Sequence, residues 1–139
     1  MTNLVLDASI ALAWCFEDEV TTATQRILAR LGTEAALVPV IWPLEVANAL
    51  TIAERRRRIT RADSAEFIAT LESLAISVDE ATASLGFTRI LDLAREQRLT
   101  VYDAAYLELA MRLGVPLASK DGALCDAAER VGVTVVRAG

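Results

Sequence analysis

The sequence contains no histidine at all. This absence excludes Ser-His and Cys-His nucleophiles, two-histidine zinc sites and acid/base catalysis by an imidazole. Cysteine is almost as scarce, because Cys15 and Cys125 stand alone, without the spacing of a metal site. Isolated thiols of this kind are typical of a protein in a reducing cytosol, where they stay buried and unpaired.

Long apolar runs are also missing, although 54% of the residues are hydrophobic. No uncharged apolar stretch approaches the ~20 residues that a membrane helix requires. The N-terminus has no basic segment ahead of an apolar one, so no signal peptide is predicted. The length of 139 residues suits one domain. We therefore expect a single cytoplasmic domain spanning residues 1–139, without membrane contact.

Negative charge prevails, since 19 acidic and 14 basic side chains give a net charge of −5. Such a balance argues against a nucleic-acid partner, unless a bound cation neutralises part of the acidity. The positive charge is concentrated in one block, which comprises Arg55, Arg56, Arg57, Arg58 and Arg61. The block either complements the C-terminal dipole of a helix or forms a patch for an RNA backbone or a protein partner.

β-rich runs alternate with helical patterns along the chain. Strands are predicted at residues 3–7, 36–41, 76–79, 115–119 and 133–137. Pro43 suits the first turn of a helix that reaches about Arg58, and Thr60 with Asp63 suits the N-cap of the next helix. A helix near 80–97 carries an apolar stripe of Ala83, Phe87, Ile90, Leu91 and Ala94. A helix over 102–113 is apolar nearly all round, which predicts its burial. This alternation favours an α/β fold with a mainly parallel sheet covered on both faces.

Four acidic residues stand where predicted strands give way to helices: Asp7, Glu45, Asp103 and Asp121. In an open α/β sheet the carboxyl ends of the strands line the crevice where ligands bind, so we expect the four carboxylates to converge. At ~4 Å and an effective dielectric constant of about 20, each pair would repel by roughly 4 kcal/mol. A hard cation relieves this repulsion, and oxygen ligands alone suit Mg²⁺ or Mn²⁺.

Each acid, taken alone, also has an ordinary structural explanation. Asp7 and Asp121 are suited to cap the helices that follow them, and Glu45 and Asp103 to complement a helix dipole in a first turn. Helix capping alone does not explain why all four acids are expected at the same edge of one sheet. Their shared position therefore favours a metal site. Three polar neighbours are candidates for supporting roles, such as orienting a carboxylate: Ser9, Asn48 and Ser119.

Four segments together resemble the signatures of PIN-domain ribonucleases, and most closely the VapC-type toxins of toxin–antitoxin pairs. They are residues 3–9 (NLVLDAS), 43–50 (PLEVANAL), 99–110 (LTVYDAAYLELA) and 118–121 (ASKD). The resemblance implies a three-layer α/β/α sandwich that uses Mg²⁺, or Mn²⁺ in its place, to hydrolyse RNA. The family's catalytic, metal-binding acids carry over onto Asp7, Glu45, Asp103 and Asp121, and its small hydroxyl residue onto Ser9. Many relatives have Thr where Ser119 stands, and Lys120 receives no role.

The same resemblance implies partners for the chain. VapC-type toxins usually form homodimers and are silenced by a segment of a cognate antitoxin, which lies in a groove near the active site. Trp14 and Phe16 follow Asp7 closely and are candidates to line such a groove.

Other protein classes also place acids at strand ends. A haloacid-dehalogenase-type phosphatase needs a second acid two residues after its nucleophilic aspartate, where this chain has Ser9. A receiver domain would leave Glu45 unexplained, and Asp79 is a poor match for its phosphorylated aspartate. A ribonuclease with a housekeeping role, and a binding module without turnover, remain open alternatives.

Overall fold

The computed structural model describes residues 2–139. In it, parallel strands alternate with helices along the chain. The strands are β1 (Thr2–Leu6), β2 (Ala35–Val38), β3 (Ile76–Val78), β4 (Leu117–Ser119) and β5 (Val135–Arg137). The α-helices are α1 (Ala8–Cys15), α2 (Thr22–Arg30), α3 (Ile41–Arg55), α4 (Arg61–Ser73), α5 (Leu91–Gln97), α6 (Val101–Leu113) and α7 (Gly122–Arg130). No helix of the described residues is long and apolar enough to cross a bilayer.

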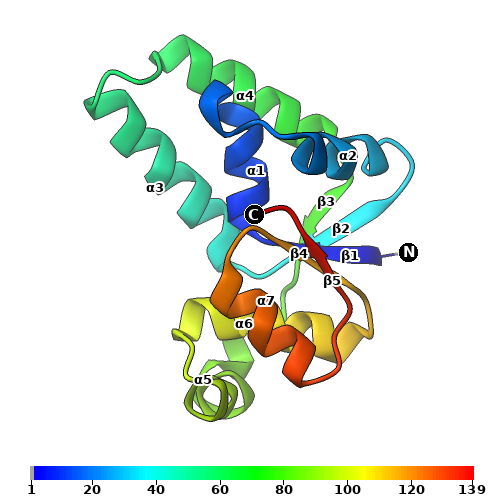
Figure 1. Cartoon of the computed structure of the whole chain (residues 1–139). Coiled ribbons are helices and arrows are strands. Elements are labelled where there is room, and N and C mark those ends of the chain that lie inside the picture. The colour runs from blue at the N-terminus through cyan, green and yellow to red at the C-terminus, as the bar shows by residue number, and fades with distance from the viewer. Residues whose placement is uncertain (1) are drawn as a thin grey trace.

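The five strands form one sheet in the order β3-β2-β1-β4-β5, and every neighbouring pair is parallel. Helices α1 to α4 lie on one side of this sheet and α5 to α7 on the other (Figure 1). The predicted α/β architecture, with a mainly parallel sheet between two helical layers, is therefore confirmed. Burial on both faces also explains why the central strand β1 is apolar without alternation.

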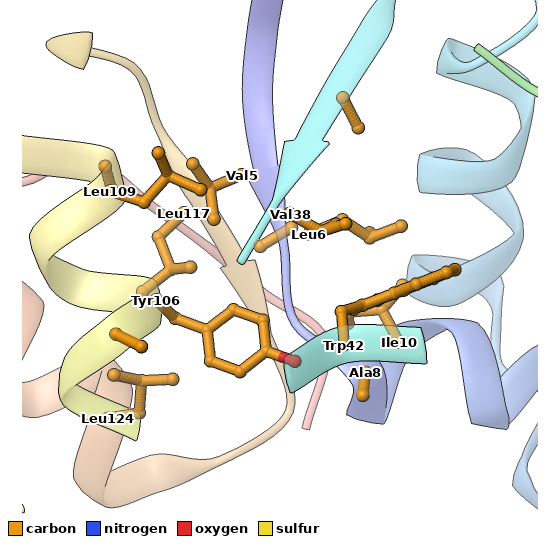
Figure 2. Packing of buried hydrophobic residues seen from close by; sticks show 14 of the residues in the cluster. Val5, Leu6, Ala8, Ile10, Val38, Trp42, Tyr106, Leu109, Leu117 and Leu124 are labelled. Carbon is orange, nitrogen blue, oxygen red and sulfur yellow. The ribbon is translucent and has the colours of Figure 1, made fainter. Parts of the chain in front are cut away.

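The core surrounds β1 and its neighbours. Leu4, Val5 and Leu6 have no exposed surface, and Leu117 from the adjacent β4 is equally enclosed. Figure 2 shows these strands packed between residues of α6 on one side and of α1 and α3 on the other. The centre of the sheet is thus enclosed on both faces, and Asp7 directly follows the enclosed end of β1.

Helix α6 is the most deeply buried helix segment, as its all-round apolar sequence predicted. All seven residues from Ala104 to Ala110 are buried. Thr100 caps the helix by accepting a hydrogen bond from the backbone N–H of Asp103, and Gly114 ends it in the left-handed region at φ 66°. A glycine is favoured there because a side chain would crowd the backbone at positive φ.

Two predicted boundaries around α3 were wrong. The strand expected over 36–41 ends at Val38, because the Pro39 carbonyl accepts a hydrogen bond from the Trp42 N–H and so starts the helical turn. The helix expected to reach about Arg58 ends at Arg55. Arg57 adopts a φ of 59°, and the Arg58 N–H bonds back to the Ala53 carbonyl. This is the hydrogen-bond pattern of a Schellman cap, here with an arginine at the usual glycine position.

The continuous helix predicted over 80–97 was also wrong. A 3₁₀ turn (Ala83–Leu85) leads into a π-helical turn (Gly86–Ile90), and only residues from Leu91 onward are α-helical. The wider π turn shifts the side chains out of α-helical register. Ile90 and Ala94 are buried as expected, but Phe87 from the same predicted stripe is 95% exposed.

Candidate active site

The sheet brings the ends of β1 and β4 together at its topological switch point. From β1 the chain moves to β2 on one side, while β4 lies on the other. Ligands of open α/β sheets bind in the crevice outside the carboxyl ends of strands at such a point. Asp7 directly follows β1, and Ser119 is the last residue of β4, two positions before Asp121.

Asp7 lies at the bottom of this crevice and is only 6% exposed. It occupies the N-cap position of α1, yet its side chain makes no cap hydrogen bond. Its Oδ2 instead accepts hydrogen bonds from the hydroxyls of Ser9, at 2.7 Å, and Ser119, at 2.6 Å. The capping explanation for Asp7 was therefore wrong, and both serines have the carboxylate-orienting geometry considered from the sequence.

The two serines also tie neighbouring loops to this carboxylate. The Ser9 hydroxyl accepts a hydrogen bond from the Lys120 N–H at 3.1 Å, and the Ser119 hydroxyl accepts one from the Asp121 N–H at 2.9 Å. Each hydroxyl thus has a donor and an acceptor role, and both donate to the same carboxylate oxygen, Oδ2, which fixes that side of Asp7.

Glu45 is held by a residue that the sequence reasoning missed. Because α3 starts at Ile41, Glu45 lies beyond the first turn, and its expected dipole role does not apply. Its Oε1 accepts a 2.6 Å hydrogen bond from the hydroxyl of Tyr106, which is fully buried in α6. Figure 2 shows the Tyr106 ring extending from α6 toward the start of α3. The only local signal for Tyr106 was its position one helical turn after Asp103.

Asp103 and Asp121 both lie at helix starts, as the alternative explanations expected. Asp103 occupies the first turn of α6, where a negative charge complements the dipole. Asp121 caps α7, because its Oδ1 accepts a hydrogen bond from the Leu124 N–H at 2.9 Å. A structural role and a place at the crevice therefore coincide in these two residues.

One cavity of about 300 Å³ collects all four predicted acids. Its lining comprises Asp7, Ala8, Ser9, Leu12, Glu45, Asn48, Asp103 and Asp121. Ser119 lies beneath this surface, where it is completely buried. The structure thus brings together every site residue proposed from the sequence, from the end of β4, from α1, α3 and α6, and from the residues that precede α1 and α7.

The carboxylates in this cavity disfavour one another's charge. Burial raises the pKa of Asp7, and the charge of Asp121 adds to the increase, while the serine hydrogen bonds oppose it. Burial, followed by the charges of Asp121 and Asp7, raises the pKa of Asp103 to about 6.

The same factors act on Glu45 and its tyrosine. Burial raises the pKa of Glu45, and the charges of Asp7 and Asp103 contribute, although the Tyr106 hydrogen bond acts in the opposite direction. Burial also raises the pKa of the Tyr106 hydroxyl, together with the nearby charges of Asp7 and Glu45. Tyr106 therefore remains a neutral donor toward Glu45 at any ordinary pH.

This donor set fits a hard divalent cation, because every polar side chain that lines the cavity carries an oxygen atom that can act as a ligand. These atoms are the carboxylate oxygens, the Ser9 hydroxyl and the amide oxygen of Asn48. Among residues 2–139, no group of three or more acidic or thiol side chains is close enough to enclose a cation unaided. That openness is compatible with Mg²⁺, which usually retains several waters and completes its coordination with substrate phosphate oxygens.

A larger, separate cavity of about 840 Å³ lies between α1, α2 and α4. Its apolar lining consists of Trp14, Cys15, Phe16, Leu28, Ile59 and Phe67. Its polar lining is mostly acidic and consists of Glu17, Asp18, Asp63, Glu66, Arg58 and Thr70. We call this cavity the helical groove. Trp14 and Phe16, predicted to line a partner groove, are both part of it.

Comparisons with known proteins give one family and several similar folds. The model of the PIN domain family matches residues 4–130. The structure of PAE2754 from Pyrobaculum aerophilum superposes with a TM-score of 0.70 at 24% identity, covering 97% of this chain and 91% of that one. FitAcB from Neisseria gonorrhoeae gives 0.62 at 15% identity, with 95% of both chains covered. VapC20 from Mycobacterium tuberculosis, described as a sarcin-ricin loop cleaving toxin, gives 0.66 at 17% identity, covering 98% and 100%. No curated protein matches the chain significantly.

Proposed function

The chain belongs to the PIN domain family, whose members are generally nucleases, and from this premise we propose that it is a metal-dependent ribonuclease. The observation that carries the proposal is the cavity that joins Asp7, Glu45, Asp103 and Asp121. Burial and mutual repulsion raise the pKa of three of these acids. Carboxylates whose charged form is disfavoured in this way by their surroundings are typical of functional sites.

In the proposed mechanism, Asp7 and Asp121 would hold the cation, while Glu45 and Asp103 would hold it through water or orient the attacking water. Mg²⁺ or Mn²⁺ held there would supply Lewis-acid stabilisation of the negative charge on the scissile phosphate. Ser9 and Ser119 keep the Asp7 carboxylate in one orientation. Tyr106 keeps Glu45 directed into the cavity. Asn48, on the cavity wall, is available to the phosphate or sugar of the RNA.

The test is cleavage of a labelled mixed-sequence RNA by the purified protein. We expect hydrolysis with Mg²⁺ or Mn²⁺, none in excess EDTA, and none with Glu45→Gln. The matched control is Asp92→Asn, which neutralises an exposed acid of α5 outside the cavity. Full activity in EDTA would overturn the metal mechanism. Tight RNA binding without any cleavage would favour the non-catalytic binding module instead.

We further propose that the chain is the toxin of a toxin–antitoxin pair, acting in the cytoplasm as a homodimer. Two features support this assignment: the resemblance to VapC-type toxins, and the helical groove. The groove joins an apolar floor to an acidic rim, which suits an amphipathic segment with basic side chains. A cognate antitoxin is the partner that the proposal places there.

Expression in bacterial cells separates a toxin from a housekeeping ribonuclease. We expect the wild-type chain to slow growth, and Glu45→Gln to leave growth unaffected. Coexpression of the small protein encoded next to it should restore growth and co-purify with the chain. Harmless expression of protein that cleaves RNA in vitro would instead support a housekeeping role.

A further inference from the structure

One solvent-facing stripe of α3 leads out of the acidic cavity. Residues separated by three or four positions share a helix face, and Glu45, Asn48, Ile52 and Arg55 form such a series. Glu45 and Asn48 line the cavity, and the side chains of Asn48, Ile52 and Arg55 are exposed. Val46, Leu50 and Ala53 are buried on the other face of the same helix, and Val46 and Leu50 belong to the hydrophobic core.

The stripe ends at a cluster of arginines on the turn between α3 and α4. Figure 1 shows this turn at the end of α3 that lies farthest from the sheet. We call the cluster the arginine tip, and it consists of Arg55, Arg56, Arg57 and Arg61. All four are exposed, and no ion pair or side-chain hydrogen bond to them occurs within residues 2–139.

The fifth arginine of the sequence block behaves differently. Arg58 pairs with Asp18 at 3.0 Å, and its guanidinium lies over the Phe16 ring at 4.3 Å. It therefore belongs to the helical groove. The structure separates the block into one cation engaged in packing and four that are available to an anion.

The arginine tip lies within reach of a strand bound in the cavity. Ten residues separate Glu45 from Arg55, which corresponds to ~15 Å along a helix. A polynucleotide whose phosphate occupies the cavity would therefore place a phosphate only a few nucleotides away beside the tip. Complementing the dipole of α3 explains a single basic residue in its last turn, but not four.

We propose that the arginine tip binds the sugar–phosphate backbone of the RNA substrate, on one side of the bond that is cleaved. The inference rests on the proposed ribonuclease function. RNA is favoured over an acidic protein because the exposed stripe of α3 connects the tip to the acidic cavity. The tip supplies local positive charge to a chain whose net charge is −5. It would contribute affinity without reading sequence, as phosphate contacts do.

The experiment compares two quadruple variants with the same charge change. The tip variant is Arg55→Gln, Arg56→Gln, Arg57→Gln and Arg61→Gln. The control is Arg26→Gln, Arg89→Gln, Arg95→Gln and Arg98→Gln, which are exposed arginines elsewhere. Arg98 also matches Arg57 in backbone conformation, since their φ values are 55° and 59°. Both sets are made in an Asp7→Asn background, which prevents cleavage while binding to a single-stranded RNA of about 12 nucleotides is measured.

We expect the tip variant to raise the dissociation constant at least about tenfold near 0.1 M salt, and the control less than about threefold. The slope of log K against log salt should decrease by roughly 0.7 for each phosphate of the single strand that the variant no longer neutralises. Replacing the same four arginines by lysine should restore most of the binding, because the charge is retained.

Equal affinities of the tip and control variants would overturn the inference, provided that the wild-type protein cleaves RNA. A wild-type protein that neither binds nor cleaves RNA would overturn the proposed function as well. Loss of the antitoxin complex by the tip variant, with unchanged RNA binding, would assign the tip to the protein partner and also overturn the inference. Melting temperatures of all variants establish that the fold is intact.

Discussion

The hydroxyl of Tyr106 donates a 2.6 Å hydrogen bond to Oε1 of Glu45 and so joins α6 to α3 at a carboxylate of the acidic cavity. The tyrosine is fully buried, whereas the carboxylate is only partly so. The bond therefore connects the Glu45 carboxylate, at the cavity surface, to a residue held in the core. This arrangement restricts Glu45 to one position without adding a charge to the site.

Replacing Tyr106 by phenylalanine should slow catalysis more than it destabilises the fold. Without the bond the Glu45 carboxylate is no longer held in one orientation, and misplacement of a catalytic group lowers the rate, so we expect kcat to decrease roughly tenfold or more. The Glu45 carboxylate can turn toward water, so the melting temperature should change little. Tyr102→Phe is the control, because Tyr102 belongs to the same helix and is 59% exposed. Equal kcat values for the two variants would show that Tyr106 is only a core residue.

Neutralising Asp121 should separate its role as the N-cap of α7 from its proposed role in RNA cleavage. Asparagine and aspartate are equivalent helix caps, whereas alanine at an N-cap costs ~1 kcal/mol. Asp121→Asn should therefore keep or raise the melting temperature, since it also removes repulsion with Asp7 and Asp103. Asp121→Ala should lower it, and both variants should lose RNA cleavage. Cleavage at the wild-type rate by Asp121→Asn would mean that the residue is a cap and nothing more.

Asp7→Asn should likewise abolish cleavage without unfolding the protein. The amide oxygen of asparagine can still accept the hydrogen bonds of the Ser9 and Ser119 hydroxyls. Removing the buried charge relieves the unfavourable burial that raises the pKa of Asp7. Thermal unfolding and an RNA cleavage assay measure the two effects separately. A large loss of stability together with retained activity would contradict the site assignment.

The raised pKa of Asp103 predicts that metal-free protein becomes less stable as pH rises. Its value increases from 3.8 to about 6 in the folded state. Between these values the unfolded chain releases the proton while the folded chain keeps it, so ionisation favours unfolding. Stability contributed by this group should be lost between pH 4 and 6 and stay constant above about pH 7.

The measurement is a series of melting temperatures in EDTA for the wild type and for Asp103→Asn. The difference between the two proteins isolates the contribution of Asp103 from that of other acids. We expect the wild type to lose stability relative to the variant as pH rises through this window. A difference that is independent of pH would show that Asp103 titrates normally.

A partner bound in the helical groove should protect Cys15 from thiol reagents. Cys15 lines the groove and is partly exposed, whereas Cys125 is buried in α7. Burial raises the pKa of the Cys15 thiol, and the charge of Asp63 adds to this increase, so labelling should be slow at neutral pH. We expect the cognate antitoxin to slow it further, while Cys125 remains unlabelled throughout. Unchanged labelling of Cys15 in a stable complex would locate the partner elsewhere.

Local sequence patterns were sufficient for most of the fold and for the location of the acids. The five strands and the buried helix α6 follow from apolar runs, and Thr60 with Asp63 forms the predicted capping box. The convergence of Asp7 and Asp121 follows from the general rule that parallel strands end at one sheet edge. These predictions needed no knowledge of which side chains touch.

The features that were missed depend on interactions between distant segments. Nothing near Tyr106 in the sequence indicates a hydrogen bond to a residue 61 positions away. The helix predicted through Phe87 failed because periodicity does not distinguish a π turn from an α-helix. The sequence suggested that Ser119 orients a carboxylate, but it did not show that this carboxylate would belong to Asp7, 112 positions away.

The end of α3 has a consequence for how this protein can change over evolutionary time. Arg57 occupies a left-handed position that glycine would fill with less strain, by ~1 kcal/mol or more. Selection for stability alone would thus favour glycine at position 57 and remove a positive charge from this turn. Whether lineages of this protein keep arginine or acquire glycine here is therefore a record of what the turn has been selected to do.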